Sequence, residues 1–564
     1  MSRLLLLFVC LLWMTGAAEG PAAAGYDLPR VGLFLAAQFV AVLAVGGWCR
    51  VAARRVSART FARSARRLGW VLLVARLFIV GWFACGVFSL GWAGFVMNGL
   101  GLNRFQVAWL PALVVGTLPA VLAWVGLWWA QFPLDHELRQ QGLTESLIDG
   151  LPVHAPPGLG AYLLSNVRLQ LLFTVLPVML IVAVRDVAAV VILPQFDPPP
   201  AALEAMDAPA GGEPAADRLA APPRRPAGVD AARDQAEGLI WLGSAGLVFL
   251  LAPEVLRRIL QTSPMPDGPL RRRLEALCRR SGMRVRDILV WHTHHHVGNA
   301  AVMGLVPRVR YVLLSDLLLE RMDDEQVEAV FAHEVGHVVH RHMAWYVVFF
   351  LIMLLVSLGP AALAKDWLAR LPVPAEAWTL LSLAASTGAF WLVFGFLSRR
   401  FERQADVYAA RMMEAARPAD PAAGADALSP LLGMTAADRA ARAARRDEGR
   451  PRRTPIASHV GTYGAQLFAS ALHRVATINN MPVNARARRG PGVINHIGHT
   501  IGSLTDLAHD WLHGSIPTRM NYLRTISADP SLTTRFDRLM GRLYGLLLFV
   551  LIASAAYVVP MLVR

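Results

Sequence analysis

The chain has 564 residues, a mean hydropathy of +0.42 and only 17% charged residues, a composition too apolar for a soluble globular protein. The formal net charge of +15 comes almost entirely from arginine, because Lys365 is the only lysine. Much of this charge lies beside hydrophobic segments, where basic residues set topology, which argues against nucleic-acid binding. The four cysteines form no C-x-x-C pair, which excludes a disulfide scaffold or a thiolate zinc site.

The N-terminus carries a short apolar run. Residues 4–14 follow Arg3 and precede a stretch of mostly small residues at 15–20. Eleven apolar residues are too few to cross a bilayer. The pattern therefore predicts a signal peptide over residues 1–20.

Hydrophobic segments long enough to span a membrane follow along the chain. We predict eight spans, at about 31–49, 72–97, 107–130, 169–193, 238–256, 344–364, 376–397 and 541–563. The pair Arg185-Asp186 interrupts the fourth span. Such a pair fits either a polar cavity or a membrane interface, and we favour the interface.

The loop after the first span carries seven arginines between residues 50 and 67. Because basic loops stay in the cytoplasm, this loop is predicted to be cytoplasmic. Alternation then places 194–237 outside and both 257–343 and 398–540 inside. We expect a multi-pass protein of the plasma (inner) membrane.

Two Pro- and Ala-rich segments contain almost no aromatic residue and are predicted to be disordered linkers. The predicted organisation is a signal peptide at 1–20, four spans within 21–193, an external linker at 194–237, the fifth span with the catalytic core and spans six and seven at 238–414, a cytoplasmic insertion at 415–458, the C-terminal part of the catalytic domain at 459–540 and a final helix at 541–564.

The run His333-Glu334-Val335-Gly336-His337 is an H-E-x-x-H motif between hydrophobic spans. On a helix, residues four apart share a face, so both imidazoles can bind one zinc ion. Glu334 then lies beside the open coordination position, where it can accept a proton from water.

A catalytic zinc usually has three protein ligands. His340 lies on the same face but about 10 Å along a straight helix from His333, which is too far for one ion. Glu402 and Asp406 are better placed, because they follow the seventh span at the same membrane face. One of these carboxylates can bind zinc while the other accepts the free N–H of a ligand histidine.

These residues resemble the membrane gluzincins, the family of the type 1 CAAX prenyl proteases and the HtpX proteases. The matching elements are Asn299 to Gly304, Ala332 to His337, Glu402 to Asp406, and His513 to Arg519. In the last element Gly514 replaces the proline usual in the family. The first 240 residues and both linkers carry no motif of this family.

The resemblance implies one zinc ion per chain, held by His333, His337 and Glu402. Glu334 would be the general base. It also implies four supporting roles: Asp406 orienting a ligand histidine, Asn299 opening an edge strand that binds the substrate backbone, His513 stabilising the oxyanion and Arg519 bracing the site.

The cluster His292, His294, His295 and His296 lies between a strand-like segment and Asn299. A second metal site is the alternative to a polar turn near the cleft. We expect the turn, because the sequence offers no nearby carboxylate to complete a metal site.

The predicted fold is therefore a mainly α-helical, polytopic membrane protein with a zincin-type α+β peptidase domain on the cytoplasmic face. That domain should contain a small sheet or hairpin at about 286–315. The predicted function is zinc-dependent hydrolysis of peptide bonds. The expected partners are peptide or membrane-protein substrates and the lipid bilayer, and no nucleic acid. Quality control is favoured over processing of a lipidated or C-terminal substrate. A catalytically silent scaffold is the alternative from another class, and it has no need of all four of His333, Glu334, His337 and Glu402.

Overall fold

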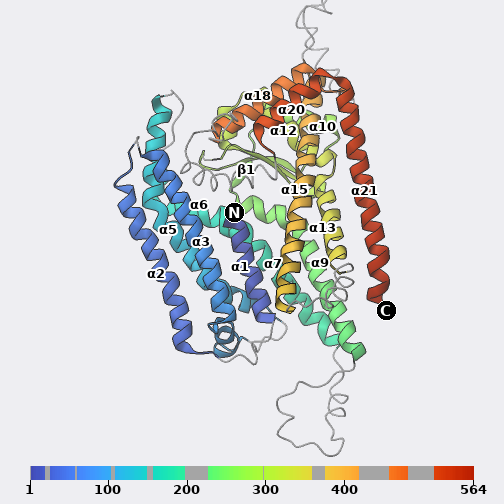
Figure 1. Ribbon diagram of the computed structural model, residues 1–564. Helices are drawn as coiled ribbons and strands as arrows, with labels where there is room; N and C mark the ends of the chain where they lie inside the picture. Colours follow the sequence, from blue (N-terminus) through green and yellow to red (C-terminus); the bar gives the residue numbers. More distant parts are fainter. Residues whose placement is uncertain are drawn as a thin grey trace, which may run out of the picture. The chain divides into compact units, whose positions relative to one another are not determined.

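The computed structural model divides the chain into two compact units, Met1–Leu260 and Gln261–Arg564 (Figure 1). The structure describes residues 2–18, 26–57, 60–102, 108–148, 156–196, 227–295, 297–358, 375–417, 456–479 and 514–563.

The described part of the first unit is helical. Its elements are α1 (Ser2–Ala18), α2 (Leu28–Ala53), α3 (Phe61–Phe88), α4 (Trp92–Gly94), η1 (Phe95–Gly99), α5 (Leu110–Ile148), α6 (Leu159–Asn166), η3 (Val167–Leu172), α7 (Phe173–Ile192), η4 (Leu193–Phe196) and α9 (Ala227–Ile259). Leucine, valine, alanine and tryptophan dominate the interior of this bundle.

Helix α1 belongs to the core of the first unit. Leu6, Val9 and Trp13 are each 1% exposed. A Cβ atom added at Gly116 of α5 would lie 2.2 Å from the Trp13 ring, so the absence of a side chain there lets the indole pack against the α5 backbone. The predicted signal peptide at residues 1–20 receives no support from this arrangement, in which the apolar run is an integral helix.

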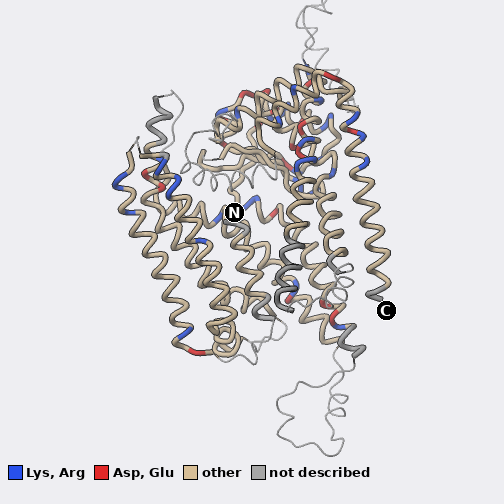
Figure 2. The backbone as a smooth tube through the Cα atoms, viewed as in Figure 1, with Lys and Arg blue, Asp and Glu red and all other residues tan. Residues whose placement is uncertain are grey.

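Contacts within the first unit define the directions of its helices. Cβ atoms added at Gly46 and Gly126 would lie 3.4 Å from Ala130 and 3.1 Å from Val42, respectively, so α2 and α5 run parallel. Trp82 of α3 donates a hydrogen bond to the Phe34 carbonyl near the start of α2, so α3 runs antiparallel to α2. Basic residues gather near the α2–α3 turn, whereas the helix bodies are mostly uncharged (Figure 2).

The pair Arg185-Asp186 is buried where α5, α7 and α9 meet. Arg185 pairs with Glu237 of α9, and its guanidinium lies over the rings of Trp109 and Trp241. Asp186 accepts a 2.7 Å hydrogen bond from the Leu110 amide at the start of α5. The pair therefore links α7 to α9 and to the start of α5, and its position relative to the membrane interface stays a prediction.

The second unit contains a four-stranded mixed sheet in the order β1-β2-β4-β3. Strands β2 and β4 pair in parallel, while β1–β2 and β3–β4 are antiparallel. The predicted sheet at 286–315 is confirmed, although β1 lies outside that range. The strands are β1 (Thr262–Pro264), β2 (Asp287–Trp291), β3 (Ala300–Met303) and β4 (Tyr311–Ser315).

Helices cover this sheet and extend from it. They are α10 (Pro269–Ser281), η6 (Pro307–Val309), α11 (Asp316–Arg321), α12 (Asp324–Val339), α13 (His342–Leu358), α15 (Ala375–Ala415), α18 (Thr462–Ile478), α20 (Ile516–Ala528) and α21 (Pro530–Val563). Fully buried Val312 and Leu314 of β4, Phe331 of α12 and Phe401 of α15 belong to one continuous core.

Within the described residues, six segments are long and apolar enough to cross a membrane, which makes the chain a multi-pass membrane protein. They are Leu28–Ala53, Arg63–Phe88, Leu110–Gln141, Leu159–Phe196, Ala232–Ile259 and Pro530–Pro560, and they correspond to six of the eight predicted spans. Of the other two predicted spans, 344–364 begins on α13 and extends past the described residues, whereas 376–397 lies within α15. The predicted polytopic helical fold with a small sheet is therefore confirmed.

Candidate active site

Helix α12 carries the H-E-x-x-H motif. It begins after Asp323, whose backbone is extended, and Asp324 and Glu325 occupy its first turn, where carboxylates complement the helix dipole. His333 is buried and His337 lies one turn further along the same face. The two Nε2 atoms are 3.3 Å apart, so both rings point to one position.

Gly336 allows α15, the helix that carries Glu402, to lie close to α12. A Cβ atom added at Gly336 would lie 3.0 Å from the Ala405 Cα of α15 and 3.2 Å from the Tyr408 Cβ. Because glycine has no side chain, α12 and α15 can approach at this level. The approach places Glu402 opposite the two histidines.

His333, His337 and Glu402 form a compact group. One ligand atom of each lies within 4.8 Å of the others, the arrangement that a single metal ion requires. The Glu402 carboxylate oxygens lie 3.5 Å from His333 Nε2 and 3.8 Å from His337 Nε2. Among the described residues this is the one group with metal-site spacing, and His340 is not part of it.

Asp406 and Arg519 support this group from behind. Asp406 is completely buried and lies 3.0 Å from His333 Nδ1. Arg519 of α20 donates through Nε to Asp406 at 2.9 Å and lies 3.3 Å from Glu402. Burial alone would raise the pKa of Asp406, but Arg519 and His333 hold it below its ordinary value. Asp406 is thus an anion that accepts a hydrogen bond from the Nδ1–H group of His333.

The chemistry of these side chains fits zinc. Since Asp406 accepts a hydrogen bond from the Nδ1–H of His333, the neutral form of this ring has its lone pair on Nε2. Burial and the neighbouring His333 lower the pKa of His337 to about 4, so this ring is neutral at pH 7. Burial alone would lower the pKa of His333, yet Asp406 and Glu402 raise it to about 9. The site therefore favours positive charge between two imidazoles and a carboxylate, the ligands of a gluzincin zinc.

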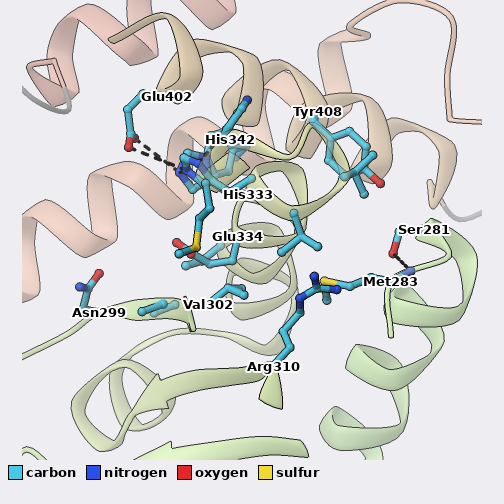
Figure 3. Close-up of a pocket in the computed structure, with 18 of the residues that line it drawn as sticks. Ser281, Met283, Asn299, Val302, Arg310, His333, Glu334, His342, Glu402 and Tyr408 are labelled. Carbon is cyan, nitrogen blue, oxygen red and sulfur yellow. Dashed lines mark hydrogen bonds and ion pairs between the residues drawn. The ribbon is translucent and has the colours of Figure 1, made fainter. Parts of the chain in front are cut away.

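The group opens into a cavity of about 1350 Å³. Glu334 lines this cavity beside His333, and residues 299–302 form another part of its wall (Figure 3). Asn299 immediately precedes edge strand β3 and is fixed to β4 through two hydrogen bonds with Ser315. The proposed base and the free edge of the sheet thus face one space.

Two sequence-based expectations concern residues 513–514. His513 lies outside the described residues. Gly514 has φ +75°, a conformation that proline cannot adopt because its ring fixes φ near −65°. Glycine therefore allows a left-handed backbone just before α20 that the proline usual in the family would exclude.

The histidine cluster forms a turn after β2. His294 and His295 have φ values of 56° and 59°, and His292 Nε2 lies 2.7 Å from Ser263 Oγ. The expectation that no carboxylate is near was wrong, because His295 Nδ1 lies 2.7 Å from Glu320. Glu320 is far from His295 along the chain, so the sequence did not reveal it as a partner. No metal-site group occurs in the described part of the cluster, which leaves out His296.

One contact of the site was not anticipated. His342 is 1% exposed, and its Nδ1 lies 2.9 Å from His337 Nδ1. From the sequence alone, His342 is expected to be either a supporting or a surface residue. A break in the helix between the two histidines brings the rings together.

A polytopic helical chain whose second unit pairs an H-E-x-x-H helix with a distant glutamate is a membrane metalloprotease by class. Residues 264–541 match the sequence profile of peptidase family M48. This match assigns residues 264–541 to that family and confirms the resemblance found in the sequence.

Two relatives share segments of the chain. A protease HtpX homolog from Aeropyrum pernix is 29% identical over 126 residues, which cover 22% of this chain and 37% of the relative. A CAAX prenyl protease 1 homolog from Arabidopsis thaliana is 26% identical over 106 residues, which cover 18% of this chain and 25% of the relative. The matches thus span a minority of either relative.

Proposed function

We propose that the protein is a zinc metalloendopeptidase, with His333, His337 and Glu402 as the ligands of one zinc ion. The observation that carries the proposal is the convergence of these side chains at the wall of the same cavity as Glu334. A zinc ion at this position would supply a Lewis acid that polarises the scissile carbonyl and lowers the pKa of a water molecule.

The residues of the chain would supply the proton transfers and the positioning. Glu334 accepts a proton from the attacking water and returns it to the leaving amine. Edge strand β3 offers unpaired backbone groups to an extended substrate, beginning at Asn299. Arg519 holds Glu402 and Asp406 in place, and His513 is proposed to stabilise the oxyanion.

Replacement of Glu334 by glutamine tests this mechanism. Glu334→Gln protein should retain zinc, because Glu334 is not a ligand, and should lose at least about 100-fold in peptidase activity, the usual contribution of a general base. Casein hydrolysis or self-cleavage with parallel zinc analysis gives the answer. Near-wild-type turnover by the zinc-loaded variant would rule the mechanism out.

The proposed biological role is quality control of membrane proteins, with the active site on the cytoplasmic side of the plasma membrane. The arginine-rich composition suggests a bacterial source, where prenylated CAAX substrates are not expected. One relative is named an HtpX homolog and the other a CAAX prenyl protease 1 homolog, so processing of a defined substrate is the second candidate.

Quantitative proteomics of membranes distinguishes these roles. Cells that carry Glu334→Gln protein should accumulate many membrane proteins if the role is quality control. Accumulation of one precursor, with an altered C-terminus, would support processing instead. An unchanged membrane proteome would contradict both roles.

A further inference from the structure

A chain of hydrogen bonds leads away from His337 through Nδ1, the ring nitrogen that is not directed at His333 and Glu402. His337 Nδ1 lies 2.9 Å from His342 Nδ1, and His342 Nε2 lies 2.9 Å from Gln404 Oε1. The Tyr544 hydroxyl of α21 donates to the same Gln404 oxygen. Four side chains from α12, α13, α15 and α21 are thus connected.

A break in the helix places His342 in this chain. On a straight helix His342 would point about 140° away from His337, because each residue turns about 100°. Helix α12 instead ends at Val339, α13 begins at His342, and the two are bent by 46°. Arg341 between them has φ 55°, an unfavourable conformation for a residue with a side chain. The backbone thus adopts a costly turn exactly where the turn brings the two rings together.

The ring of His342 is held in one orientation. It is 1% exposed and stacks on Phe401 with centroids 4.4 Å apart and planes 1° from parallel. Gln404, its hydrogen-bond partner, is 6% exposed and follows Glu402 by two residues on α15. Stacking and burial therefore prevent the ring from turning away from His337.

The partners determine the position of each proton. Gln404 Oε1 can only accept, so His342 donates from Nε2 and its neutral ring has a lone pair on Nδ1. His337 must then donate from Nδ1, which leaves the lone pair of its Nε2 directed at His333 and Glu402. The opposite orientation of the Gln404 amide would reverse every proton and put one on His337 Nε2, where it would exclude a cation.

We propose that His342, fixed by Gln404 and Tyr544, is a positioning residue that selects the metal-binding tautomer of His337 and connects α21 to the metal centre. This inference rests on the proposed zinc site. It assigns to His342 the role that Asp406 has for His333, so that each ligand histidine has its own buried acceptor.

The zinc dissociation constant of the purified full chain, measured by competition with a chromophoric chelator, tests the inference. His342→Phe keeps a stacking ring without nitrogen and should weaken zinc binding about 10- to 100-fold, the usual cost of losing such a partner. His342→Asn places an amide oxygen near the position of Nδ1 and should recover most of the affinity. Tyr544→Phe should weaken binding about fivefold, the worth of one hydrogen bond.

His340→Phe is the matched control, because the His340 ring stacks on His342 and meets Tyr408 edge-to-face but is not one of the three ligands. Its zinc affinity should match the wild type, and the melting temperatures of the zinc-free variants should show that the fold is intact. Wild-type affinity in His342→Phe, or equal losses in His342→Phe and His342→Asn, would overturn the inference while the proposed function stands. A wild-type protein that binds no zinc would overturn the proposed function itself.

Discussion

Two acidic residues one helical turn apart have different surroundings in this site. Glu402 points to the space between the two histidines, whereas Asp406 lies behind His333 and is paired with Arg519. The sequence left open which carboxylate binds the metal, because both share one helix face. The backbone of α15 places Glu402 on the cavity wall, and this position supports Glu402 as the proposed ligand.

Three substitutions test the assignment of these residues. Glu402→Ala should lose most of the zinc, because a ligand is removed, and His340→Ala should keep it. Asp406→Ala should lower zinc affinity about 10- to 100-fold, because His333 loses the acceptor of its Nδ1 proton. Metal analysis of the purified variants measures all three. Full zinc in Glu402→Ala together with metal loss in His340→Ala would show that the wrong ligand was chosen.

Helical periodicity explains why much of the site could be predicted. The positions of His333, Glu334 and His337 on one helix, and of Glu402 and Asp406 on another, follow from a spacing of 3.6 residues per turn. His342 could not be placed in this way, because its position depends on the left-handed conformation of Arg341. No sequence pattern encodes a positive φ at an arginine.

At the level of single elements, Asp316 holds the turn that follows β2. Its carboxylate accepts hydrogen bonds from the Thr293 amide at 2.9 Å, the Thr293 hydroxyl and the His295 amide at 3.2 Å. Burial alone would raise the pKa of Asp316, but these bonds and one from the Leu317 amide hold it below 3.8. The charged form is therefore the one that stabilises the turn.

Asp316→Asn should destabilise the protein at pH 7 by about 1–2 kcal/mol, because charge-assisted hydrogen bonds are lost. The folded pKa is depressed, so this contribution is fully present above the unfolded pKa near 3.8 and disappears as the pH falls through the folded value. Thermal melting in detergent at pH 7, 5 and 3.5 should show a difference that narrows only at the lowest pH.

Asp267→Asn provides the control for this measurement, because the Asp267 side chain is fully exposed and lies 3.6 Å from Arg271. It should melt like the wild type at every pH. A pH-independent difference between Asp316→Asn and the wild type would show that the charge of Asp316 does not matter.

The buried arginine of the first unit provides a second test at this level. Arg185 is 2% exposed and is surrounded by Asp186, Glu237 and two indole rings. Arg185→Met should destabilise the protein by about 3–5 kcal/mol, because the carboxylates lose their counter-charge. Melting in detergent measures the loss. Arg258→Met, at a side chain that is 72% exposed beside Glu254, should cost less than about 1 kcal/mol, and equal losses would contradict the argument.

The sheet shows where prediction of elements from the sequence ends. The apolar run at 287–291 and the edge strand expected from Asn299 indicated two strands, and the structure contains β2 and β3 there. Strand β1 is only three residues long and includes a proline, so no periodicity could reveal it. It forms because its backbone pairs with β2 at the edge of the sheet opposite β3.

At the scale of the whole molecule, helix directions in the first unit agree with the alternation derived from charge. Arg50 at the end of α2 lies 5.1 Å from the Trp129 ring of the parallel helix α5. The arginine-rich turn and the C-terminal half of α5 therefore lie at one end of the unit. At the other end of α5, Asp186 of α7 accepts a hydrogen bond from the first residue of α5, and Arg185 pairs with Glu237 of α9. This arrangement is expected if α7 runs outward and α9 inward.

This agreement leads to a prediction of topology for the full chain. Residues 194–237 should be external and residues 415–458 cytoplasmic, because the arginine-rich loop at 50–67 is held inside. Ala205→Cys and Ala436→Cys, each in a chain whose four native cysteines are replaced by serine, place one thiol in each segment. A membrane-impermeant maleimide should label Cys introduced at 205 in intact cells, and Cys introduced at 436 only after permeabilisation. Retained peptidase activity shows that the labelled chains are folded. The reverse labelling pattern would place Glu334 and the three proposed zinc ligands on the external side. The search for substrates would then turn from cytoplasmic segments of membrane proteins to exported proteins.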